Sequence, residues 1–108
     1  LILTNSKNLK ESRADTYERL ASTSNRFKNY SRAVNSYLNA VKLYKELGNL
    51  LKAGSNLELI ADVYEDKKEY DKANQYLIQS IEVYKQAGDK EQEAESYWDL
   101  AYNLGQFQ

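Results

Sequence analysis

The chain has 108 residues, of which 42% are hydrophobic and 29% charged, and it contains no Pro, Cys or His. Without Cys and His it lacks the side chains of most transition-metal sites and the commonest general base, so we expect no metal, no cofactor and no enzymatic activity. The net charge of −1 hides an asymmetry, because residues 1–53 hold ten basic and four acidic residues, whereas residues 54–108 hold five and twelve. This asymmetry is either scatter over solvated helix faces or complementarity, between copies or toward a partner that carries both signs.

The composition also bounds the surroundings of the chain. No apolar run approaches the roughly 20 residues of a membrane-spanning helix, and residues 1–3 are too short for the apolar region of a signal peptide. The basic half has no dense cluster of Lys and Arg interleaved with aromatic residues, which argues against nucleic-acid binding. We therefore expect a cytoplasmic protein without membrane insertion. Because the sequence does not begin with Met, we expect it to be a piece of a longer protein.

Apolar residues recur at three- and four-residue spacing along the chain, which is typical of amphipathic helices. In chain order the pattern predicts the end of a helix over residues 1–6, followed by five helices near residues 9–27, 30–47, 50–67, 70–87 and 90–105. One stripe is especially clear on the second of these five helices, where it comprises Ala33, Tyr37, Ala40, Val41 and Tyr44.

Gly and Asn mark the predicted corners. Gly48 and Gly88 follow the second and fourth helices, where a helix C-terminus needs a residue that tolerates positive φ, and Asn8 takes the same place 40 residues before Gly48. Asp89 is the expected N-cap of the last helix. No linker or low-complexity segment interrupts the pattern, so no domain boundary is predicted.

The helices repeat with a period of 40 residues. Two segments return in register: Tyr30-Ser-Arg-Ala33 as Tyr70-Asp-Lys-Ala73, and Leu43-Tyr-Lys-Glu-Leu-Gly48 as Val83-Tyr-Lys-Gln-Ala-Gly88. A period of this length indicates a repeat array, in which each unit buries its apolar face only against its neighbours. Ala61 recurs as Ala21 and Ala101, and its small side chain is expected to let two helix axes approach closely.

The spacing of the recurring residues resembles that of the tetratricopeptide repeat. The second unit carries the family's large, small and aromatic positions in Leu57, Ile60, Ala61, Tyr64, Ala73, Leu77 and Ser80. The same positions are filled in the first unit by Tyr17, Leu20, Ala21, Ser24, Ala33, Tyr37 and Ala40, and in the last half-unit by Tyr97, Leu100, Ala101 and Leu104. The chain differs from the family in its period, which is usually about 34 residues, and in lacking the family's closing Pro.

The resemblance implies an all-α fold in which antiparallel helix pairs stack as a right-handed superhelix. The chain is then a single repeat segment: residues 1–8 end a preceding repeat, residues 9–48 and 49–88 are two repeats, and residues 89–108 are a half repeat. Long repeats of this kind are similar to those in bacterial signalling proteins and in eukaryotic vesicle-fusion adaptors. The corner around Gly48 does not decide between these two groups.

The resemblance also implies a concave groove lined by the first helix of each unit. Its positions in this sequence are Asp15, Glu18, Ser22, Asn25, Ser55, Glu58, Asp62, Glu65, Glu95, Trp98 and Tyr102. A clamp for the C-terminal carboxylate of a chaperone is not expected, because members that have one place Lys, Asn and Arg where this chain has Glu18 and Ser22. We expect a basic or amphipathic peptide instead, anchored near Trp98. The alternatives are that the acids are merely solvated and that Trp98 packs against a further helix.

These observations predict a non-catalytic scaffold that binds a peptide or helix of a partner protein, within a larger signalling or regulatory protein. Two alternatives stay open at this point. One is a self-associating assembly segment, in which the apolar end helices and the oppositely charged halves join copies. The other is an adaptor of the vesicle-fusion type.

Overall fold

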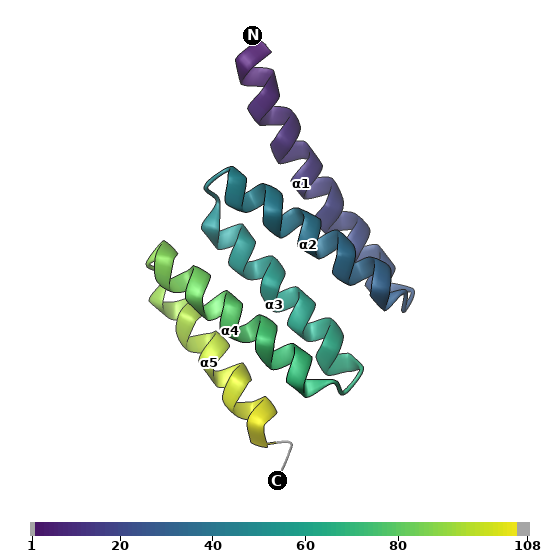
Figure 1. The fold of residues 1–108 in the computed structure, drawn as a ribbon, viewed down its shortest axis with the longest axis vertical. Coiled ribbons are helices and arrows are strands. Elements are labelled where there is room, and N and C mark those ends of the chain that lie inside the picture. Colours follow the sequence, from purple (N-terminus) through teal and green to yellow (C-terminus); the bar gives the residue numbers. More distant parts are fainter. Residues whose placement is uncertain (1, 106–108) are drawn as a thin grey trace.

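The computed structural model describes residues 2–105, with side chains described from residue 6 onward. It contains five α-helices: α1 (Ile2–Arg26), α2 (Tyr30–Glu46), α3 (Leu50–Asp66), α4 (Tyr70–Ala87) and α5 (Lys90–Gly105). Successive helices run in opposite directions and lie side by side in chain order (Figure 1). The all-α fold and the four corners between the predicted helices are thus confirmed.

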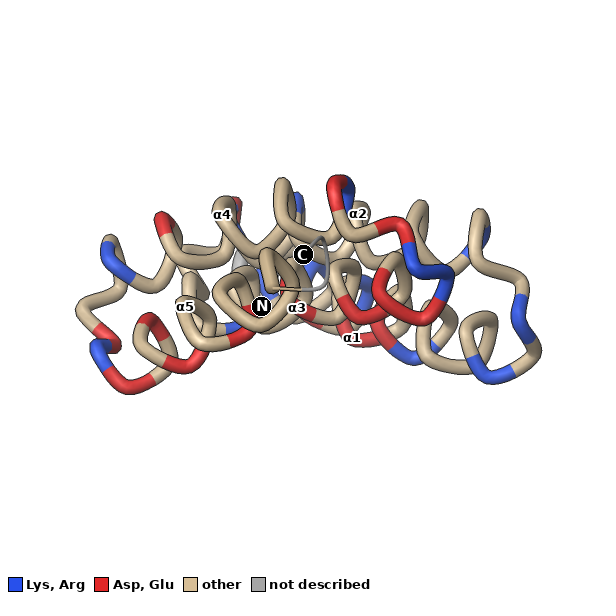
Figure 2. The backbone as a smooth tube through the Cα atoms, turned by 90° about the horizontal axis from the view of Figure 1, so that it is seen from below, with Lys and Arg blue, Asp and Glu red and all other residues tan. Residues whose placement is uncertain are grey.

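The helices form two layers. Figure 2 shows α1, α3 and α5 in one layer and α2 and α4 in the other, with both ends of the molecule bent toward the side of α1, α3 and α5. The Cα atoms span 57 × 34 × 15 Å, a depth that fits two layers of helices about 8–10 Å apart. The layer of α1, α3 and α5 therefore lines the concave face.

The corners explain why the helices end where they do. Gly48 and Gly88 both adopt a φ of +76°, as predicted, and the Asp89 carboxylate accepts a hydrogen bond from the Gln92 amide at 3.1 Å, which confirms it as an N-cap. The other two corners were not expected to need positive φ, yet Lys28 and Lys68 have φ of 64° and 61°. These two residues are 40 positions apart, as Gly48 and Gly88 are, so the positive φ at the corners also repeats with the 40-residue period.

The corner predicted at Asn8 is wrong, because α1 runs without a break from Ile2 to Arg26. Asn inside a helix costs only a few tenths of a kcal/mol relative to average residues, and neither Gly nor Pro occurs in this stretch to end the helix. The N-terminal part of α1 projects beyond the other helices (Figure 1), so no packed neighbour forces a turn there. The assignment of residues 1–8 to a preceding repeat stays a prediction.

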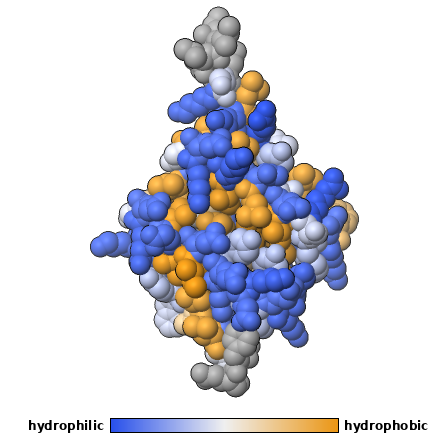
Figure 3. All heavy atoms as spheres, in the orientation of Figure 1, coloured by the Kyte–Doolittle hydropathy of each residue, from blue (hydrophilic) through white to orange (hydrophobic). Residues whose placement is uncertain are grey.

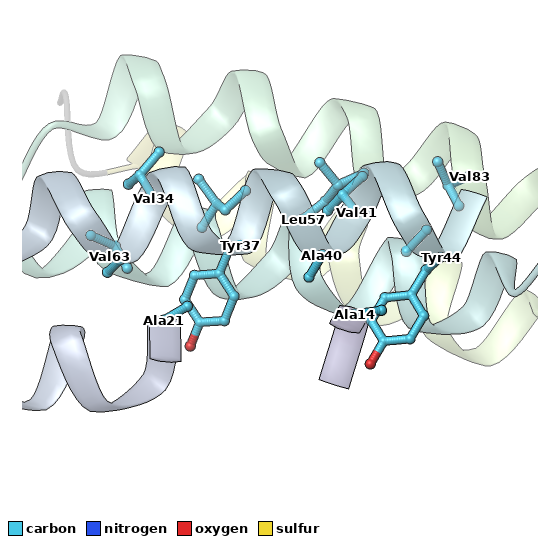
Figure 4. Close-up of a cluster of buried hydrophobic side chains, with 13 residues drawn as sticks. Ala14, Ala21, Val34, Tyr37, Ala40, Val41, Tyr44, Leu57, Val63 and Val83 are labelled. Carbon is cyan, nitrogen blue, oxygen red and sulfur yellow. The ribbon is translucent and has the colours of Figure 1, made fainter. Parts of the chain in front are cut away.

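The core follows the recurring small residues. Ala21, Ala33, Ala40, Ala61 and Ala73 are all fully buried, and larger side chains fill the space between them. The main cluster joins α1, α2 and α3 with Val83 of α4 and includes the labelled side chains of Figure 4, while Ala61, Ala73 and Leu77 form a second cluster between α3 and α4. Within residues 2–105, none of the helices combines the length and apolarity that a membrane span requires.

Candidate protein-binding groove

A buried tyrosine of α2, Tyr44, holds two acidic residues of α1 on the concave face. Tyr44 is 1% exposed, and its hydroxyl hydrogen-bonds Asp15 and lies 3.3 Å from Glu18 Oε1. Asn56 of α3 donates from Nδ2 to the same Glu18 oxygen at 3.1 Å. In Figure 4 the rings of Tyr37 and Tyr44 point the same way, past Ala21 and Ala14 of α1, with the hydroxyls outermost. Tyr44 thus contributes its ring to the core and its hydroxyl to the groove.

The arrangement recurs 40 residues later in altered form. The Tyr84 and Ser96 hydroxyls interact with the Glu58 carboxylate, as Tyr44 and Asn56 do with Glu18. Glu58 Oε1 is nevertheless buried without a well-aligned donor. Burial raises the pKa of Glu58, and the hydrogen bonds from Tyr84 and Ser96 oppose that shift. Glu18 and Glu58 are therefore partly structural, since each accepts the hydroxyl of a buried tyrosine.

Four carboxylates come together where α3 and α5 face the groove: Glu58, Asp62, Glu65 and Asp99, named here the acidic cluster. Burial, together with the neighbouring Glu65 and Asp99, raises the pKa of Asp62 to about 7. Burial also raises the pKa of Glu65, although a hydrogen bond from Asn103 Nδ2 at 2.6 Å opposes the shift. The Asp62 residue is exposed, but the groups packed around its carboxylate remove part of the hydration that would stabilise the charge.

The acidic cluster has no internal counter-ion. Among the described residues, the Lys ion pairs involve Glu46, Glu18 and Glu69, and no Lys or Arg nitrogen lies within 4.0 Å of a carboxylate of the cluster. Four acids without a cation repel one another, and this repulsion contributes to the raised pKa of Asp62. A cationic group placed among them would lower the electrostatic free energy of the site.

Comparison with known proteins agrees with this architecture. The family model for the tetratricopeptide repeat matches residues 12–86. The chain belongs to the tetratricopeptide repeat family. Repeats of this family generally mediate contacts between proteins and are typically non-catalytic. No curated protein matched the sequence.

The tetratricopeptide register places the predicted groove residues in different surroundings. Asp15 and Glu18 meet at Tyr44, Ser22 hydrogen-bonds Tyr37, and the α3 acids belong to the acidic cluster. Ser55 lines a hollow with Tyr84 and Asp89, and Asn25 is half-buried with an unpartnered Oδ1. Glu95 is exposed and adds negative potential at Glu58, and Tyr102 is 70% exposed.

Trp98 stands apart from the other predicted positions. It is 77% exposed and lines an apolar hollow with Ala94, Tyr97 and Ala101 on the outer side of α5. Tyr97 and Ala101 belong to the packing stripe of the tetratricopeptide unit, so Trp98 lies beside that stripe as well as at a predicted groove position.

Sequence reasoning missed the residues that hold the groove acids in place. The repeat pattern predicts only packing roles for Tyr44 and Tyr84, and it predicts no role for Asn103 or Asp99. Comparison of the repeats does not predict an acidic residue at the position of Asp99, because the equivalent residues are Leu59 and Arg19. A usable signal was the recurrence of Tyr 26 residues after two of the groove Glu residues, at 18 and 44 and again at 58 and 84.

Replacing Asp62 by Asn is expected to stabilise the protein at pH 8. The pKa of Asp62 is raised to about 7 from 3.8, so the folded state binds a proton more tightly than the unfolded state does. The ionised carboxylate therefore costs stability as the pH rises from 4 to above 7. Because the side chain is exposed to water, we expect a gain of only about 1 kcal/mol at pH 8, shrinking to near zero at pH 4.

Urea unfolding at both pH values measures this difference. Glu11→Gln, which neutralises an exposed acid on α1 outside the acidic cluster, serves as the control and is expected to change stability by less than about 0.5 kcal/mol. Equal effects of Asp62→Asn at pH 4 and pH 8 would contradict the assignment of a raised pKa.

Proposed function

We propose that the concave face binds a basic segment of a partner protein, with a Lys or Arg side chain entering the acidic cluster. The observation that carries this proposal is the cluster itself: carboxylates on α3 and α5 that share no internal counter-ion among the described residues. An ammonium or guanidinium group supplies the charge that the site lacks, and a guanidinium can bond two carboxylates at once.

The carboxylates differ in how free they are to meet a partner. Glu58 accepts from Tyr84, and Glu65 accepts from Asn103, so both are already oriented by the fold. Asp62 and Asp99 lie exposed on the neighbouring helices α3 and α5 of the concave layer. We infer that these two make the direct contact with the cation, while the other two supply a fixed negative field.

The protonation of Asp62 gives the proposal a second signature. At pH 6 most copies of Asp62 hold a proton, because its pKa is about 7, and a bound cation has to displace that proton. Affinity for a basic peptide is therefore expected to increase between pH 6 and pH 8. If binding displaces the single proton of Asp62, the increase over this range is up to about tenfold.

Charge reversal in the groove tests the function. A library of 16-residue peptides rich in Lys, Arg and Leu is titrated against the wild type and against the double variant Asp62→Lys/Asp99→Lys. These positions are chosen because replacing Glu18 or Glu58 would also remove the acceptor of a buried tyrosine hydroxyl. We expect the tightest peptides to lose at least about tenfold in affinity, since attraction becomes repulsion.

A matched control separates the site from the net charge. Glu11→Lys/Glu82→Lys changes the net charge by the same amount at exposed positions on α1 and α4, outside the acidic cluster. It is expected to change affinity less than about threefold at physiological ionic strength, where screening is strong beyond about 8 Å. Equal losses in both double variants, or no loss in either, would refute binding at the acidic cluster.

A further inference from the structure

A hollow lies between α3 and α5, about two helical turns from the acidic cluster. It has a volume of about 280 Å³, and we name it the Tyr84 subsite after its most buried residue: Leu51, Ser55, Tyr84, Asp89 and Gln92 line it. Both helices that flank it belong to the described chain. The 40-residue register therefore gives its equivalent in the same molecule, one unit earlier, between α1 and α3.

In the earlier unit an internal cation occupies the equivalent place. The residues that correspond to the lining of the subsite are Asp15 for Ser55, Tyr44 for Tyr84, and Lys52 for Gln92. Asp15 hydrogen-bonds the Tyr44 hydroxyl. Lys52 Nζ lies 5.8 Å from the centroid of the Tyr44 ring and 3.9 Å from Glu18 Oε1. An ammonium thus rests over the ring of a buried tyrosine, beside the groove Glu that accepts its hydroxyl.

Two exchanges between the units account for the hollow. Ser55 has a shorter side chain than the equivalent Asp, so it leaves space beside the Tyr84 ring. Gln92 is neutral where the earlier unit has a Lys, so the cation is missing. Leu51, which is 50% exposed, adds an apolar wall of the kind against which the methylene groups of a long cationic side chain pack.

The second unit keeps the negative charges that surround such a cation. Burial and the hydrogen bond to Glu58 raise the pKa of the Tyr84 hydroxyl. The charges of Glu58, Asp89 and Glu95 raise this pKa further, so three acids lie close enough to act on the hydroxyl. Across the described residues, no Lys or Arg nitrogen comes within 4.0 Å of these three carboxylates. The ring and the acids would both attract a cation.

We propose that the Tyr84 subsite is a second cation-binding site of the groove, in which a Lys of the bound segment places its ammonium over the Tyr84 ring. This inference rests on the proposed function, because it concerns the same basic segment. The partner's Lys takes the place that Lys52 takes over Tyr44, with its methylene groups along Leu51.

The two cation sites set a spacing for the partner. Ser55 and Asp62 are seven residues apart on α3, and Gln92 and Asp99 are seven apart on α5. Seven residues of helix rise about 10.5 Å. An extended segment covers about 10 Å in three residues, so it reaches both sites with two cationic residues three positions apart.

Supplying the missing cation from the protein tests the subsite without a partner. Gln92→Lys restores the residue type of position 52, and Lys and Gln have similar helix propensity. A cation in the first turn of a helix is otherwise unfavourable, so a gain has to come from the subsite. We expect the melting temperature to rise by about 4 °C at low salt and the gain to shrink in 1 M NaCl.

The control is Gln79→Lys, the same exchange at an exposed position of α4, in the layer that faces the viewer in Figure 3. It is expected to raise the melting temperature by less than half as much, because it adds the same charge away from the groove. A rise of equal size in both variants, or a rise in neither, would overturn the proposal.

Binding is measured with ten-residue peptides at low salt, labelled with a dye for fluorescence anisotropy. One contains Lys-Ala-Ala-Lys between Gly and Ser residues, and two others keep only one of the two Lys. The two-Lys peptide is expected to bind the wild type at least about fivefold more tightly than either single-Lys peptide. Gln92→Lys is expected to weaken its binding at least about fivefold, and Gln79→Lys less than about twofold, because only the former fills the subsite with the protein's own ammonium.

The outcomes separate this inference from the proposed function. Equal affinity of the two-Lys peptide for Gln92→Lys and Gln79→Lys would overturn the Tyr84 subsite, and so would an absence of binding to the wild type at millimolar concentration. The acidic cluster is tested separately, by the library titration of Asp62→Lys/Asp99→Lys. A loss of affinity in Gln92→Lys without one in that double variant would support the Tyr84 subsite and refute the acidic cluster.

Discussion

Replacing Gly54 by Ala is expected to destabilise the protein by about 1–3 kcal/mol, although the same exchange in an exposed helix stabilises by about 0.5–1 kcal/mol. A Cβ atom at this position would lie 2.7 Å from Cε1 and 2.9 Å from Cζ of the Tyr84 ring. Tyr84 is 2% exposed and its hydroxyl interacts with Glu58, so the ring cannot move away without losing packing and a hydrogen bond. Urea unfolding of the variant and the wild type measures the cost.

A second substitution shows whether the ring is the cause. In a Tyr84→Leu background the aromatic atoms nearest to the added methyl group are gone, and Gly54→Ala is expected to become neutral or stabilising. The coupling between the two substitutions then has the size of the steric cost, about 1–3 kcal/mol. A higher melting temperature for Gly54→Ala in the otherwise unchanged chain would contradict the contact with Tyr84.

The repeat register predicted most of the fold because packing in such an array is local. Each helix contacts mainly the helices before and after it, so the spacing of the buried Ala21 and Ala61 carries the information that the pairing needs. The same register failed at Asn8, since a repeat position alone does not end a helix when no neighbour packs against it. Local propensity prevailed there over the period.

The candidate groove was less predictable, for a physical reason. Periodicity identifies which way a side chain points, but a hydrogen bond such as that between Tyr44 and Asp15 depends on the reach of a side chain across two helices. Asp99 joins the acidic cluster through curvature, which brings α5 toward α3 and does not show in the spacing of either helix. The sequence alone therefore does not tell which groove acids accept hydrogen bonds from the fold and which are free, and the structure does.

The exchange of Ala61 for Leu is expected to be similarly costly, by about 1–3 kcal/mol. Ala61 is fully buried and packs with Ala73 and Leu77 where α3 crosses α4, so three more carbon atoms have no space without separating the helices. Thermal unfolding followed by circular dichroism measures the loss, which we expect to lower the melting temperature by about 4–8 °C for each kcal/mol.

Ala101 provides the matched control, because it occupies the same register position on α5 but is exposed. Ala101→Leu adds the same atoms with the same change in helix propensity, and no helix of the described chain lies over it. It is expected to change stability by less than about 0.5 kcal/mol. A similar loss at both positions would mean that the bulk of Leu in the helix, and not the crossing with α4, sets the cost. A loss confined to Ala61 would assign the cost to the crossing with α4.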